Sequence, residues 1–187
     1  MKRKTIETQQ DICTKEFVLS DKEFYAIGAC RKKDTILCVA SSPWYKGIWG
    51  RDVHGERSII TLADPSSAIG YTHAWYSSLP KGIIDAMLCV PVGTFEDDAY
   101  YLTELGTKMF VPSAAEWMCI PHEIRLTITN GIRVWTRIAL EDTGTGISCI
   151  DTDGELHGSQ HGTEKYGIVP AFYLKETVVR QLLQNVA

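Results

Sequence analysis

Short apolar stretches alternate with polar turns along most of this chain, and few segments show the longer period of a helix. Phe24–Cys30 and Thr35–Ser41 are rich in apolar residues and flank the polar Lys32-Lys33-Asp34, which predicts a β-hairpin. The next segment, Pro43–Asp52, is rich in aromatic residues and glycine without either period, so we expect an ordered loop there.

The last third of the chain repeats the hairpin pattern. Ile147–Thr152 and Leu156–Gly158 flank Asp153-Gly154, a dipeptide typical of tight hairpin turns. Arg133–Ile138 before them and Ile168–Leu174 after them also have the composition of strands.

Three segments predict helices. Lys81–Met87 has the composition of a short helix, and Thr177–Asn185 is amphipathic at helical spacing. Ser113 precedes Glu116 by the spacing of a capping box, which predicts a helix start. Further strands are expected at Ser58–Leu62, Leu88–Val92, Met109–Val111 and Ile124–Ile128.

Many short strands with a few short helices indicate the α+β class. The length of 187 residues suits one domain with its own core. We expect an N-terminal extension over residues 1–22, the domain over 23–175 and a terminal helix over 176–187.

The net charge is acidic, at −4, which disfavours general binding to nucleic acid phosphates. The basic Lys2-Arg3-Lys4 leads into polar residues rather than an apolar run, so no signal peptide is expected. No apolar stretch approaches the roughly 18 residues of a spanning helix, so no membrane association is expected.

The six cysteines have no metal-ligand or Cys-x-x-Cys spacing. We expect them to be small buried apolar residues in a reducing cytoplasm, above all the four with apolar neighbours. The cysteines are Cys13, Cys30, Cys38, Cys89, Cys119 and Cys149, and the four are Cys30, Cys38, Cys89 and Cys149.

Four motifs, in this order, resemble those of a domain family of bacterial and phage proteins. They are Phe110–Trp117, Trp135-Thr136-Arg137, the Asp153-Gly154 turn and Gly167–Leu174, within residues 23–175. The resemblance implies a C-type-lectin-like fold of short, mostly antiparallel strands with long ordered loops, similar to the formylglycine-generating enzymes. It also implies that the loops between the second and last motifs face a ligand.

The chain departs from that family pattern at three points. Val169 stands where the family usually has an arginine, and Ile138-Ala139 stands where it often has serine-proline. The paired catalytic cysteines of the formylglycine-generating enzymes have no counterpart, so their activity is not expected here.

Within the predicted ligand-facing region, Trp135 and Arg137 lie two apart and so share one face of a strand. They form either a stacking platform at a binding surface or a half-buried tryptophan beside a paired arginine. His157 and His161 have the spacing of a helical metal pair, but the glycine after each disfavours a helix. A polar display loop is the preferred interpretation.

Carboxylates are frequent in the same region. Asp142, Asp151, Asp153 and Glu155 offer a calcium site as an alternative, but they lack a dense ligand run. Asp151 and Asp153 suit the hairpin turn better. We therefore expect no metal and no cofactor.

The aromatic segment beginning at Trp44 is either a binding hot spot, as its tryptophan, tyrosine and arginine suggest, or a plug for the core. The residues predicted to bind are Trp44, Tyr45, Trp49, Arg51, Trp135, Arg137, Asp153, Glu155, His157, Gln160, His161 and Tyr166.

These features predict a non-enzymatic binding module, encoded by a phage or prophage, that recognises a protein or glycan through its C-terminal loops. It would act on the virion or in the host cytoplasm, there as an inhibitor of a host defence protein similar to anti-CRISPR proteins. An enzyme on this fold would need low-pKa cysteines. A nucleic-acid binder would need Arg125, Arg133, Arg137 and Lys165 on one face. Homo-oligomerisation through the terminal helix stays an alternative.

Overall fold

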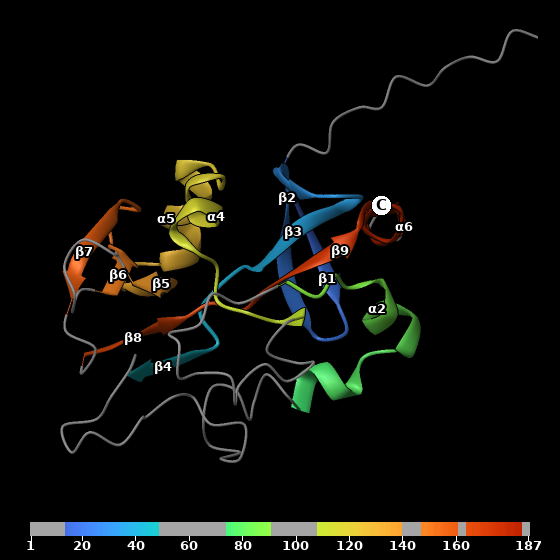
Figure 1. Cartoon of the computed structure of the whole chain (residues 1–187), viewed down its shortest axis with the longest axis horizontal. Helices are drawn as coiled ribbons and strands as arrows, with labels where there is room; N and C mark the ends of the chain where they lie inside the picture. The colour runs from blue at the N-terminus through green and yellow to red at the C-terminus, as the bar shows by residue number, and fades with distance from the viewer. Residues whose placement is uncertain (1–13, 49–73, 91–107, 140–146, 161–163, 185–187) are drawn as a thin grey trace, which may run out of the picture.

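Two β-sheets lie side by side with short helices around them (Figure 1). This arrangement belongs to the α+β class expected from the sequence. The computed structural model describes residues 14–48, 74–90, 108–139, 147–160 and 164–184.

The first sheet contains the N-terminal hairpin and the last strand of the chain, in the order β1-β2-β3-β9 with antiparallel neighbours. The predicted hairpin is confirmed, and Lys33 at its turn has a φ of 56°. Every residue of β3 is buried because β3 lies between two strands and contacts α6. The strands are β1 (Lys15–Leu19), β2 (Lys22–Lys32), β3 (Thr35–Ala40) and β9 (Ala171–Lys175).

The second sheet has five strands in the order β4-β8-β5-β6-β7. The β5–β8 pair is parallel and the other pairs are antiparallel. The predicted Asp153-Gly154 hairpin is confirmed as the β6–β7 connection. The strands are β4 (Tyr45–Ile48), β5 (Val134–Ala139), β6 (Ile147–Ile150), β7 (Leu156–Gln160) and β8 (Lys165–Ile168).

Two chain segments cross between the sheets next to each other (Figure 1). The amide of Ala40 donates to the Pro170 carbonyl at 2.9 Å, and that of Trp44 donates to the Ile168 carbonyl at 3.0 Å. The single strand predicted over Ile168–Leu174 is wrong, because β8 and β9 belong to different sheets. Pro170 between them has no N–H for a ladder.

The predicted loop over Pro43–Asp52 is also wrong in part. Tyr45–Ile48 forms the edge strand β4, which pairs with β8. Its short sequence carries no alternation, and the strand arises from main-chain pairing that local sequence does not report. The rest of that segment, from residue 49, and the predicted strand Ser58–Leu62 lie outside the described residues.

The three predicted helices are confirmed as α2, α4 and α6. Ser113 caps α4 with the expected capping box, because its side chain and that of Glu116 each bond the other residue's amide. A further short helix spans residues 74–78. The named helices are α2 (Lys81–Ala86), α4 (Ala114–Met118), α5 (His122–Thr129) and α6 (Glu176–Gln184).

Three predicted strands are not formed among the described residues. Met109–Val111 is reduced to one isolated bridge, between Phe110 and Ala171. Ile124–Ile128 lies in α5, which begins after Pro121 and ends at Asn130 in the left-handed conformation. The β-branched composition misled the prediction, and tertiary packing of the buried Ile128 overrides it. In Leu88–Val92, the described residues 88–90 form no strand, and the Leu88 amide donates to the distant Tyr173 carbonyl at 3.0 Å beside the isolated Met87–Leu174 bridge.

An aromatic cluster fills the core beside the crossing segments. The Phe24 ring lies 5.1 Å from that of Phe172 and 5.3 Å from that of Trp75, and the Trp44 and Trp75 rings are 5.2 Å apart. A smaller cluster lies in the second sheet and contains Trp135, Cys149, Tyr166 and Ile168.

The expected burial of cysteines holds for Cys30, Cys38 and Cys149 but not for Cys89 and Cys119, which are exposed, and Cys13 lies outside the described residues. Leu88 and Val90 on either side of Cys89 turn inward, so the alternation of an extended chain turns Cys89 outward. Among the residues described, no helix is long and apolar enough to cross a membrane.

Candidate functional site

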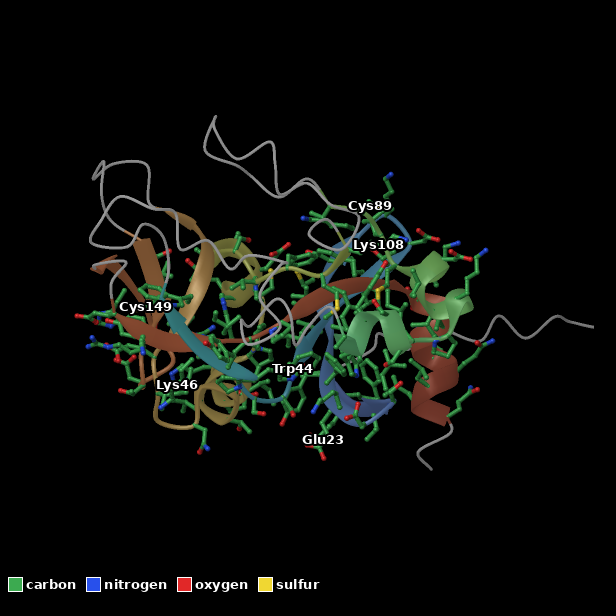
Figure 2. The ribbon with its side chains drawn as sticks, turned by 90° about the horizontal axis from the view of Figure 1, so that it is seen from below. Glu23, Trp44, Lys46, Cys89, Lys108 and Cys149 are labelled. Atoms are coloured by element: carbon green, nitrogen blue, oxygen red, sulfur yellow. The ribbon has the colours of Figure 1, made fainter. Side chains whose placement is uncertain are left out.

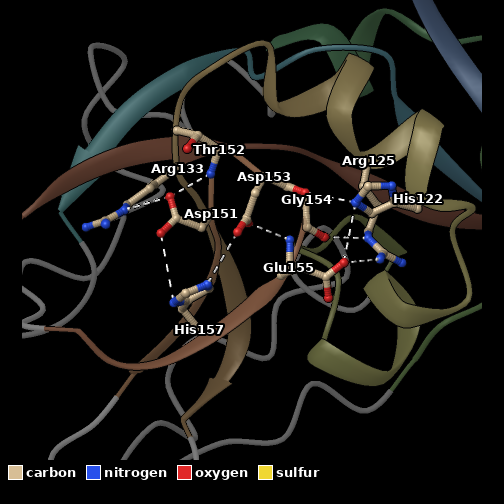
Figure 3. A network of polar contacts seen from close by, with 9 residues as sticks. All are labelled: His122, Arg125, Arg133, Asp151, Thr152, Asp153, Gly154, Glu155 and His157. Carbon is tan, nitrogen blue, oxygen red and sulfur yellow. Dashed lines mark hydrogen bonds and ion pairs between the residues drawn. The ribbon is translucent and has the colours of Figure 1, made fainter.

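Several polar side chains of the C-terminal third gather at the β6–β7 turn (Figure 3). Asp153, Glu155 and His157 project from it with 61%, 52% and 45% of their side chains exposed. We call these three residues and Asp151 the turn cluster. It faces the start of α5 on one side and the beginning of β5 on the other.

Main-chain bonds close the turn tightly. The Asp151 amide donates to the Glu155 carbonyl at 2.8 Å, and the Gly154 amide donates back to the Asp151 carbonyl at 2.9 Å. An Asp153 carboxylate oxygen accepts from the Glu155 amide at 3.0 Å. Gly154 has a φ of +79°, and a Cβ there would lie 3.3 Å from the His122 ring. Both facts favour glycine at this position.

Arg125 braces the turn from α5. Its buried guanidinium donates to the Gly154 carbonyl at 2.6 Å and to the Ile120 carbonyl at 2.9 Å. A third nitrogen lies 3.5 Å from a Glu155 carboxylate oxygen. His122 Nε2 lies 2.9 Å from the Asp153 carbonyl oxygen. The turn is therefore tied to a helix as well as to its own strands.

Arg133, just before β5, holds the other side. It donates to Asp151 Oδ1 at 3.0 Å and to the Tyr166 hydroxyl at 3.2 Å. The bond from Arg133, with a second from the Thr152 amide, lowers the pKa of Asp151 to about 2. Asp151 thus stays ionised, and its charge is matched by that of Arg133.

The remaining carboxylates are less well matched. Asp153 has a carboxylate oxygen 3.9 Å from His157 Nε2, and His157 Nδ1 is 3.9 Å from Asp151 Oδ2. Glu155 contacts Arg125 and His122 at 3.5 and 3.4 Å while half of its side chain stays exposed. The cluster consequently presents negative charge to solvent from a fixed backbone.

Trp135 and Tyr166 do not form an exposed platform. Both are buried, and their rings are 4.2 Å apart inside the smaller cluster. They share this cluster with Cys149 of β6 and Ile168 of β8. Arg137 and Gln160 lie on β5 and β7, but the positions of their side chains are outside the described part, as are His161, Trp49 and Arg51 entirely.

Trp44 and Tyr45 take different roles. The Trp44 ring packs edge-on against Phe24 and Trp75, which favours the plug interpretation, whereas Tyr45 is 40% exposed. Figure 2 shows Trp44 where the two sheets meet, with Glu23 to one side. An open, polar pocket of about 330 Å³ lies there, lined by Asp21, Lys22, Glu23, Ser41, Ser42, Pro43 and Trp44.

No local sequence signal links His122, Arg125 or Arg133 to the turn. His122 and Arg125 lie on α5, a helix that the sequence does not predict, and the sequence offers Arg125 and Arg133 only as candidates for a nucleic-acid surface. Both arginines contact acceptors of the turn, so they do not form a free basic face. Among the described residues, no group of three His, Cys, Asp or Glu side chains is arranged to hold a metal ion.

Comparison of the chain with protein-family models, curated proteins and solved structures finds no match. The assignment of a function therefore rests on the geometry of the turn cluster.

Proposed function

We propose that this protein is a non-enzymatic binding module that recognises a protein partner through the turn cluster. One observation carries the proposal: exposed Asp153 and Glu155 stand on a turn whose backbone is fixed by the buried Arg125. A surface that is rigid before binding loses little conformational entropy on association.

The chemistry of the cluster favours a basic protein surface as the partner. Carboxylates accept charge-assisted hydrogen bonds from arginine and lysine, and such pairs set orientation and association rate. A glycan would be expected to stack on an exposed aromatic ring, whereas Trp135 and Tyr166 are buried. We also propose that the protein has a C-type-lectin-like fold and is encoded by a phage or prophage. It would act on the virion or inside the host cell.

The raised pKa values of three buried thiols favour a binding function over thiol-based catalysis. Burial raises the pKa of Cys30 to about 12 and that of Cys149 to about 11, and it also raises that of Cys38. Thiols of this kind stay protonated at neutral pH and react slowly. An enzyme on this fold remains the second candidate.

The test compares two variants with equal charge changes. Asp153→Asn/Glu155→Gln removes two charges from the turn cluster and keeps side chains of the same shape. Glu16→Gln/Asp85→Asn removes two charges from exposed positions on β1 and α2. Each tagged protein is incubated with lysate of the native host, and captured proteins are quantified by mass spectrometry.

We expect the turn variant to lose a discrete captured protein by about tenfold, as for two weakened charge contacts of about 0.7 kcal/mol each. The control variant should retain it. Equal capture by both variants would overturn the assignment of the face. Capture of a glycoprotein that is lost after deglycosylation would instead support a glycan ligand.

A further inference from the structure

Two thiols that are far apart in the sequence meet between the first sheet and α4. Cys30 lies on β2 and is buried, and Cys119 is the exposed C-cap residue of α4. The Cys119 side chain neighbours Cys30, and it is one of the groups that raise the pKa of the Cys30 thiol. Each thiol therefore has a second thiol as a neighbour with which it could form a disulfide.

A shared polar network holds both cysteines in place. The Tyr173 hydroxyl lies 3.3 Å from Cys30 Sγ and donates to Glu116 Oε1 at 3.0 Å. Lys32 donates to the same carboxylate oxygen at 3.2 Å. The Cys119 amide bonds the Glu116 carbonyl at 3.2 Å, so Cys119 is attached to the turn of α4 that carries this carboxylate.

The two thiols differ in access. Cys119 is exposed and meets solutes directly. Cys30 is only 6% exposed, and its burial keeps it protonated at neutral pH. Tyr173 donates its own proton to Glu116 and can therefore accept that of Cys30. The chain Cys30–Tyr173–Glu116 provides a route by which the buried thiol loses its proton without reaching solvent.

We propose that Cys30 and Cys119 form an oxidation site, at which a low-molecular-weight disulfide converts the two thiols into an intramolecular disulfide. The Cys119 thiolate attacks one sulfur of the small disulfide. The small S–S bond breaks, a mixed disulfide forms at Cys119, and the first small thiol leaves with a proton from solvent.

In the second step, Cys30 passes its proton through Tyr173 to Glu116 and attacks the Cys119 sulfur. The mixed disulfide breaks, and the second small thiol leaves and takes up that proton. Two protein thiols are oxidised by two electrons in total, and one small disulfide is reduced to two thiols. The product links β2 to the end of α4.

The experiment uses the full chain and oxidised glutathione as the probe. After incubation, remaining thiols are alkylated and the digested protein is mapped by mass spectrometry. We expect a cross-linked peptide pair containing Cys30 and Cys119, together with a raised midpoint of thermal unfolding. Cys89, which is also exposed, should keep any glutathione adduct, since its modification does not depend on Cys30.

Variants separate the two steps. Cys119→Ser should abolish the cross-link and leave Cys30 unmodified, while Cys30→Ser should accumulate the glutathione adduct at Cys119. Tyr173→Phe should slow closure on the order of a hundredfold without slowing formation of the adduct. Cys119→Ser is at an exposed position and keeps the test valid if Cys30→Ser folds poorly.

Two results would overturn the proposal. One is a persistent adduct at Cys119 in the wild type, equal to that of Cys30→Ser. The other is an unreacted Cys119 under conditions that modify Cys89.

Discussion

The two sheets use carboxylates in opposite ways. Beside the first, Glu116 of α4 is 4% exposed and accepts from the Ser113 amide, the Ser113 hydroxyl, Lys32 and Tyr173. In the second, half of Glu155 is exposed, and its carboxylate contacts Arg125 and His122 at 3.5 and 3.4 Å. A buried carboxylate needs a full set of partners, whereas an exposed one keeps acceptor capacity for another molecule.

The same contrast holds for the aromatic residues. Around the first sheet, Phe24, Trp75 and Phe172 belong to the main core. In the second sheet, Trp135 and Tyr166 belong to a much smaller cluster below the turn. The main cluster also takes in Val134 and Ile150 of the second sheet, but most of its strand residues belong to the first, so we expect the first region to contribute more to the folding free energy.

The largest expected effect tests the first region. Phe172→Ala removes a fully buried ring from the aromatic cluster and should lower the free energy of unfolding by about 3–5 kcal/mol. Urea denaturation measures it. Tyr45→Ala, at an exposed ring of the second sheet, is the control and should change it by less than about 1 kcal/mol. Equal losses would mean that the two regions contribute alike.

The carboxylates themselves give the next comparison. Glu116→Gln keeps the shape but replaces a charged acceptor that is fully bonded, and it should cost about 1–3 kcal/mol of unfolding free energy. Glu155→Gln, at an exposed position, should cost less than about 0.5 kcal/mol. Urea midpoints of both variants check this. A larger loss for Glu155→Gln would reverse the roles assigned to the two residues.

The turns and the helix cap that frame these two regions could be predicted from the sequence, because each depends on a local signal. The hairpin around Lys33, the Asp153-Gly154 turn and the capping box of Ser113 each involve residues close in the chain. The hydrogen bonds and backbone angles of these turns and of this cap involve neighbouring residues, so they do not depend on how distant segments pack.

The remaining features depend on contacts between distant segments. Strand β4 exists because it pairs with β8, more than one hundred residues later. Arg125 reaches the turn because α5 packs beside it, and no local pattern joins Arg125 to Gly154. The meeting of Cys30 and Cys119 has the same origin. A single sequence does not report such pairs.

Alanine substitutions at two glycines test how tightly the β6–β7 turn packs against α5. Gly154 and Gly131 both have left-handed φ values, so alanine should cost each about 1–2 kcal/mol. Only at Gly154 would the new Cβ approach the His122 ring, while the space at Gly131 is open. Gly154→Ala should therefore lose more stability in denaturation, and also the captured partner. Equal behaviour of the two variants would show that the approach of His122 is unimportant.

The smallest expected effect concerns acid. Arg133 lowers the folded-state pKa of Asp151 to about 2 from its ordinary value of 3.8. A lowered carboxyl pKa means that the folded state binds protons less readily than the unfolded state. This stabilising contribution is complete above about pH 4 and is lost as the pH falls towards 2.

Asp151→Asn should therefore be less stable than the wild type at pH 6, and this difference should shrink as the pH falls from 4 to 2. Urea midpoints across that range measure it. Glu176, whose pKa is lowered by Arg180 and Arg31 at the first sheet, provides the control, since both proteins retain its acid response. A difference between wild type and variant that stays constant with pH would mean that the Arg133–Asp151 pair does not hold the turn through charge.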